Sequence, residues 1–119
     1  VHVGRVLIAV MIVLSLAGPA VSADVLQGEI LDMACFIARG EKGRGPLHAG
    51  CALACAKKGL PLGLITDDGA VYLLYPKHGK EKSFERVKEL AGQLVTLTGI
   101  ISEHDGVKGI EVGSVEARN

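Results

Sequence analysis

Apolar and polar residues alternate along several short stretches of the chain, and this period of two predicts β-strands. The clearest case is residues 94–102, where Val, Leu and Ile alternate with Thr and Ser. The pairs Asp68-Gly69 and Asp105-Gly106 separate neighbouring apolar stretches and predict hairpin turns, since Gly tolerates the positive φ that these turns need. We expect Gly113 to bend the last strand. The predicted strands are residues 25–31, 62–66, 70–75, 94–102 and 107–115.

Two other stretches show helical spacing of their apolar residues. Residues 47–58 are rich in Ala; Pro46 suits a first helical position, and Gly59 with Pro61 predicts the end. A second helix is expected after Ser83, as a capping residue, and should end at Gly92. Its apolar face comprises Phe84, Val87, Leu90 and Ala91.

The elements follow the order strand, helix, strand, strand, helix, strand, strand. Without the first helix, this is the order of a five-stranded OB barrel, a Greek-key barrel. We therefore predict a mainly β protein, an OB-like barrel over residues 24–119. Residues 34–61 form a Cys/His-bearing insertion between strands 1 and 2, and its glycine-rich part, residues 40–45, is expected to be a connecting loop because it lacks the spacing of a phosphate-binding loop.

The first 23 residues have the pattern of a cleavable signal peptide. Arg5 precedes an apolar stretch from Val6 to Leu14 that extends to Ala17, and small residues end at Ala23. This stretch is shorter than the roughly 20 residues that span a bilayer, so a retained membrane anchor is the less favoured alternative. We expect cleavage after Ala23, a periplasmic or secreted location, and no stable membrane span afterwards.

Charge and aromatic content argue against a nucleic-acid partner. The chain has 13 basic and 13 acidic residues, and removal of the leader takes away Arg5 and no acidic residue. The remaining domain is therefore slightly acidic, whereas nucleic-acid binding normally needs a basic face. Aromatic residues make up only 3% of the chain, so no base-stacking surface is expected either.

A cluster of three cysteines and one histidine is the feature with the most chemistry in it. His48, Cys51 and Cys55 have spacings that place them on one side of a helix, and Cys35 follows the first strand. Three thiols and one imidazole fit a tetrahedral Zn²⁺ site, and thiolates also suit Cu(I). His48 starts about 10 Å along the helix axis from Cys55, so it joins only if the helix begins after it or its ring leans inward.

Three other interpretations of the cluster stay open at the level of sequence. Cys35 could pair with Cys51 or Cys55 in a structural disulfide, as is common in exported proteins. The unpaired thiol could take part in redox exchange, with Lys57, Lys58 and His48 lowering its pKa. The last of the three is haem ligation by the cysteines and the histidine, although no motif for covalent haem attachment is present.

No arrangement of residues points to catalysis. His78 and His104 lie in predicted loops, and Asp67, Asp68 and Asp105 are turn residues first. We therefore expect a binding protein and not an enzyme. Its predicted partner is a metal ion, and an envelope protein is a second candidate.

The closing strands resemble those of small secreted bacterial OB-fold proteins. The similarity lies in Val95-Thr-Leu-Thr-Gly99-Ile-Ile, a hairpin and Ile110-Glu-Val112, within about residues 62–116. Secreted proteins of this kind, of uncharacterised function, carry a similar His-x-x-Cys-x-x-x-Cys helix before a Gly-Leu-Pro turn, here His48 to Cys55 and residues 59–61. The resemblance implies a fold more than a function.

Overall fold

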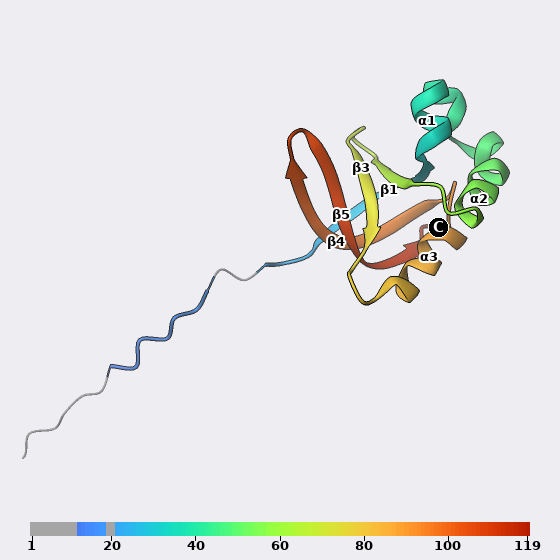
Figure 1. The fold of residues 1–119 in the computed structure, drawn as a ribbon. Helices are drawn as coiled ribbons and strands as arrows, with labels where there is room; N and C mark the ends of the chain where they lie inside the picture. Colours follow the sequence, from blue (N-terminus) through green and yellow to red (C-terminus); the bar gives the residue numbers. More distant parts are fainter. Residues whose placement is uncertain (1–11, 19–20) are drawn as a thin grey trace, which may run out of the picture.

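Five strands form the centre of the computed structural model, which describes residues 12–18 and 21–119 (Figure 1). All five were predicted from the alternating pattern, and their observed bounds differ from the predicted ones by at most two residues at either end. The strands are β1 (Asp24–Asp32), β2 (Leu62–Thr66), β3 (Val71–Pro76), β4 (Leu94–His104) and β5 (Val107–Ala117).

The strands close into a barrel in the order β1-β2-β3-β5-β4, with β4 pairing back onto β1. Every pairing is antiparallel except that between β3 and β5, which are parallel. This connectivity matches the OB-like barrel predicted from the order of the elements. The insertion that was predicted between the first two strands lies there.

The turns and the bend follow the predicted chemistry. At the β4–β5 turn, Asp105 and Gly106 both have positive φ values, 49° and 83°, as a tight hairpin requires. The β4–β5 register shifts after Thr98, so that Ser114 and Val112 pair with successive β4 residues and Gly113 is left over. Gly113 is therefore the extra residue of a β-bulge, which bends the strand.

Residues 21–119 contain three short α-helices where the sequence predicted two. The additional helix is α1 (Met33–Arg39), followed by a 3₁₀ turn over Gly40–Gly43, so the glycine-rich stretch is partly helical. The predicted helix at 47–58 is a 3₁₀ turn, Pro46–His48, that leads into α2 (Ala49–Lys57). These elements lie together at one end of the barrel in Figure 1.

The third helix begins later than predicted. A 3₁₀ turn, Glu81–Phe84, precedes α3 (Glu85–Glu89), and the hydroxyl of Ser83 donates to the carbonyl of Lys80 within that turn. Ser83 is therefore not the cap of an α-helix, because its side chain is already used in the preceding turn. The predicted apolar face is correct at Val87, Leu90 and Ala91, which are buried.

The hydrophobic core joins the insertion to the barrel. Ala52 and Ala56, one helical turn apart on α2, are almost fully buried and belong to the same cluster as Ile30 and Val95 of the barrel. These small side chains let the helix backbone approach the sheet closely. The core therefore fixes the position of α2, and with it the residues on the neighbouring side of that helix.

The segment before β1 contributes no strand or helix in its described part. The apolar side chains of Leu14, Leu16 and Val21 there are largely exposed to solvent. Arg5, the first part of the predicted apolar stretch and Pro19 lie outside the described residues. Among the described residues, no helix is both long enough and apolar enough to cross a membrane.

Candidate metal centre

Asp32, the last residue of β1, holds α1 in place. Its side chain is fully buried, and Oδ1 accepts hydrogen bonds from the backbone N–H groups of Ala34 (3.1 Å) and Cys35 (3.2 Å). These bonds cap the helix at its N-terminus. Cys35 therefore lies in the first turn of α1, anchored to the carboxylate that precedes it, and not in an extended segment after the strand.

His48 lies at the corresponding point before α2. It ends the 3₁₀ turn that Pro46 begins, and the α-helix starts only at Ala49. From the sequence, His48 was expected to join the cysteines if the helix began after it, and this condition is met. The imidazole is buried, and its Nε2 lies 3.6 Å from Oδ2 of Asp32.

The two segments bring four candidate ligands together. One donor atom each from Asp32, Cys35, His48 and Cys51 lies within 4.8 Å of every other. Three of these residues belong to the ligand set predicted from sequence. Cys55, the fourth predicted ligand, is outside this group of four, but its thiol neighbours both Asp32 and Cys51.

Asp32 was not predicted as a ligand from the sequence. Its position before Met33 is typical of a helix cap, and a single carboxylate at the end of a strand gives no metal signal by itself. Only the fold shows that one carboxylate oxygen caps α1 while the other points into the cysteine cluster.

Two buried polar atoms of this centre have unused hydrogen-bonding capacity. Oδ2 of Asp32 and Nε2 of His48 are both buried, and neither has a hydrogen-bond partner within the described part of the chain. Leaving such atoms unsatisfied costs about 1–3 kcal/mol each. Oxygen and nitrogen ligands of a tetrahedral zinc ion, each about 2.0–2.1 Å from the metal, lie about 3.3–3.4 Å apart. The observed 3.6 Å separation is close to that spacing, so one ion between them would satisfy both atoms.

The carboxylate and the thiols influence one another's protonation. Burial by itself raises the pKa of Asp32, but interactions with the thiols of Cys35 and Cys55 and with His48 outweigh it and hold that pKa below its usual value. Conversely, Asp32, burial and Cys51 raise the pKa of Cys35, and the same causes raise the pKa of Cys55 to about 12. Without a metal these two thiols are protonated at neutral pH.

These shifts are opposite to those of the redox hypothesis. There, Lys57, Lys58 and His48 were expected to lower the pKa of a thiol, as in reactive cysteines. For Cys35 and Cys55 the nearby carboxylate has the larger effect and disfavours the thiolate. A bound cation would reverse this, because it stabilises thiolate and carboxylate together.

All three cysteines lie in the described region and are free thiols in the structure. Cys51 is exposed, whereas Cys35 and Cys55 are partly buried. The sulfur atoms of Cys35 and Cys51 are no more than 4.8 Å apart. The geometry therefore keeps a Cys35–Cys51 disulfide as an alternative to metal binding.

A partly buried ion pair ties the insertion to the barrel just before His48. Glu29 on β1 is 5% exposed; it accepts a 3.2 Å hydrogen bond from Nε of Arg44 and a 2.7 Å bond from the backbone N–H of Gly45. Charge-assisted bonds of this kind are stronger than neutral ones. They fix the start of the turn that carries His48.

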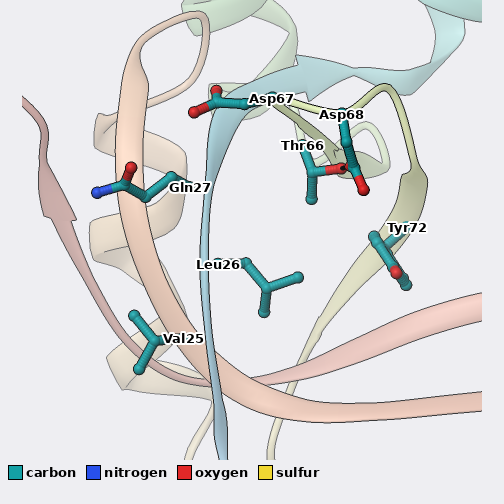
Figure 2. A pocket seen from close by; sticks show the side chains of 7 residues that line it. All are labelled: Val25, Leu26, Gln27, Thr66, Asp67, Asp68 and Tyr72. Carbon is teal, nitrogen blue, oxygen red and sulfur yellow. Dashed lines mark hydrogen bonds between the residues drawn. The ribbon is translucent and has the colours of Figure 1, made fainter.

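A groove of about 500 Å³ lies on the barrel next to the β2–β3 turn, and none of the residues that line it is a cysteine (Figure 2). Leu26 and Tyr72 supply apolar surface there. Asp67 at its rim is paired with Arg118 at 2.7 Å, and Asp68 accepts bonds from Thr66 and Ala70 that lower its pKa. The groove is lined by Val25, Leu26, Gln27, Thr66, Asp67, Asp68 and Tyr72.

Comparison with known proteins gives no further guidance to this centre. Neither the family models nor the curated proteins nor the solved structures contain a match to the chain.

Proposed function

We propose that the protein binds a single transition-metal ion at the centre formed by Asp32, Cys35, His48 and Cys51. The observation that carries this proposal is the meeting of four potential ligands, two of which offer buried atoms with no other partner in the described structure. Cys55 lies beside the centre and can replace Asp32 as a ligand if the ion moves toward it.

Zinc is the metal that this donor set favours over copper. Two thiolates, one imidazole and one carboxylate mix soft and hard donors, and Zn²⁺ accepts all three types in tetrahedral geometry. Cu(I) favours sulfur donors, so it would favour a position nearer Cys35, Cys51 and Cys55. The expected Cys₃His site and the Asp-containing site therefore differ in the metal they prefer.

We further propose that the domain acts in the periplasm or outside the cell, after cleavage behind Ala23. The leader pattern of the sequence supports export, and β1 starts at Asp24, immediately after the proposed cleavage site. Removing the leader would take away the exposed apolar side chains of residues 12–17 and no strand of the barrel. The role is binding and not catalysis, with a structural, sensing or carrier use of the ion.

The alternative is a domain held together by a disulfide and binding its ligand through the barrel. The proximity of Cys35 and Cys51 supports the disulfide, and the groove in Figure 2 supplies a surface for a ligand. A thiol redox protein is a third alternative, which the raised pKa values of Cys35 and Cys55 disfavour.

Titration of the reduced, metal-free protein with Co²⁺ tests the proposal. Cobalt replaces zinc with similar geometry, so we expect intense tetrahedral absorption bands and a sulfur-to-cobalt charge-transfer band that both saturate at one equivalent. Zinc should then displace the cobalt. His48→Ala should weaken binding by about tenfold or more, whereas His104→Ala, in the β4–β5 hairpin, is the matched control. A spectrum that shows nothing but the weak bands of hydrated cobalt would contradict the proposal.

A further inference from the structure

The proposed metal centre is closed on one side and open on the other. Asp32 and His48 are buried, while Cys51 is exposed and Cys35 and Cys55 are partly exposed. The sulfur donors therefore form the side that a molecule in solution can reach. Four protein ligands fill the coordination positions of a tetrahedral ion, so a molecule in solution must displace one of them, and the exposed thiol of Cys51 is the donor that it reaches most easily.

We propose that the centre is an exchange site, which releases its ion through Cys51 to an acceptor that carries a thiolate. This inference rests on the proposed metal binding and goes beyond it, because it selects a carrier role and names the chemistry of the acceptor. The buried carboxylate and imidazole hold the ion until the acceptor has attached.

The exchange is a ligand substitution without electron transfer. The acceptor thiol loses its proton to solvent as its sulfur bonds to the ion, and the bond between the ion and Sγ of Cys51 breaks. Cys51 then takes up a proton. When the ion leaves with the acceptor, its bonds to Asp32, Cys35 and His48 break as well and Cys35 takes up a proton from solvent, so charge and atoms balance. Cys55, one helical turn further along α2 and beside Asp32, is placed to hold the ion during this step.

The charge of the insertion favours an anionic acceptor. Residues 33–61 contain one acidic residue, Glu41, and the basic residues Arg39, Lys42, Arg44, Lys57 and Lys58. Arg44 is engaged with Glu29, but the other four basic residues are exposed. A locally positive field raises the concentration of an approaching thiolate and disfavours a cationic thiol.

Ala54 offers a way to restrict access without touching a ligand. It is exposed and lies three residues after Cys51, so the two side chains are neighbours on the surface of α2. Ala54→Leu should keep the helix and the ligand set while covering part of the Cys51 sulfur. Ala117→Leu, at an exposed position at the end of β5, is the matched control outside the insertion.

The experiment follows zinc transfer from the zinc-loaded full chain to a chromogenic chelator held at constant concentration. The thiol under test is 2-mercaptoethanesulfonate, which takes the ion from the protein before the chelator captures and reports it. Its S-methylated form has the same charge and no thiol, and it is the control. We expect the transfer rate to increase linearly with the concentration of the thiol and to be independent of the concentration of the methylated compound. Salt should reduce the slope by screening the basic residues.

The variants decide whether Cys51 is the point of entry. We expect Ala54→Leu to lower the slope several-fold and Ala117→Leu to leave it unchanged, with one zinc bound in both. Transfer that is independent of the thiol, or equal slopes in the two variants, would overturn the exchange role. A chain that binds no zinc at all would instead overturn the proposed function.

Discussion

Asp32 uses its two carboxylate oxygens in different ways. Oδ1 caps α1, and Oδ2 points toward His48 and the thiols. The first contact belongs to folding and the second to the proposed chemistry, so a suitable substitution can separate them. Asn caps helices about as well as Asp, but its amide carries no charge and is a poor metal ligand.

Replacing Asp32 by Asn should therefore weaken zinc binding by about tenfold or more and leave the melting temperature of the metal-free protein nearly unchanged. Asp32→Ala removes both the metal ligand and the helix cap. It should weaken zinc binding and also lower the free energy of unfolding by about 1 kcal/mol for the missing cap. Competition with a zinc indicator and thermal unfolding of the metal-free proteins measure the two effects. Equal zinc affinity in wild type and Asp32→Asn would remove Asp32 from the ligand set.

The raised pKa values of the thiols predict how zinc binding depends on pH. Asp32 and burial raise the pKa values of Cys35 and Cys55, so both thiols are protonated at neutral pH and zinc must displace a proton from each one that it binds. Affinity should increase with pH, by about tenfold per unit for each proton displaced. Competition titrations at about pH 6.5, 7.5 and 8.5 measure this slope. An affinity that is flat over this range would show that neither thiol is a ligand.

At the scale of elements, α2 is held against the barrel by a contact in which a glycine is essential. Gly92, with φ of 80°, follows the third helix, and a side-chain carbon there would lie 2.7 Å from Cα of Ala49. Its N–H also donates to the carbonyl of Ile30. The start of α2, next to His48, therefore depends on close approach at Gly92.

Gly92→Ala should combine backbone strain with this clash and push the start of α2 away from the barrel. The matched control is Gly79→Ala, where φ is also 80° and no atom lies near the added carbon. Both substitutions should cost about 1–2 kcal/mol for the backbone, and Gly92→Ala should cost more and also weaken zinc binding. Chemical denaturation and zinc titration of both variants test this; equal effects would contradict the packing argument.

The strands could be predicted from the sequence because each has a strong local signal. Alternation at residues 94–102 and the Asp-Gly turns do not depend on distant contacts. The helix α1 also has local signals, since Asp32 precedes it and Gly40 follows it, but no helix was predicted for the short stretch between them. Ser83 shows the opposite error, because a residue suited to capping is used instead in a 3₁₀ turn.

The candidate site could be predicted only in part for a related reason. The helical spacing of His48, Cys51 and Cys55 is visible in one dimension, whereas the approach of Asp32 depends on where β1 ends relative to α2. In the structure Cys55 lies outside the group of four donors, and the 3₁₀ turn before Ala49 places His48 in that group with Cys51. Such differences arise from packing between segments distant in sequence.

At the scale of the whole molecule, the core and the candidate centre are distinct parts of one domain. Most core residues come from the five strands and α3, and α2 contributes only Ala52 and Ala56. The centre lies at the junction of β1, α1 and α2. Removal of the metal should therefore loosen the insertion and leave the barrel folded.

Hydrogen exchange with and without zinc tests this division. We expect zinc to slow exchange in residues 33–58 and to change it little in β3, β4 and β5. The far-ultraviolet circular dichroism of the strands should stay the same when zinc is removed. Loss of protection throughout the barrel on zinc removal would show that the ion is needed for the whole fold.

The most direct test of the central claim is native mass spectrometry of the protein purified without chelator or affinity metal, followed by thiol alkylation after denaturation. If the centre binds a metal, the mass exceeds that of the chain by one metal ion, and Cys35, Cys51 and Cys55 are all alkylated. A metal-free mass with a single alkylated cysteine would contradict metal binding, and would show that two of the three thiols form a disulfide.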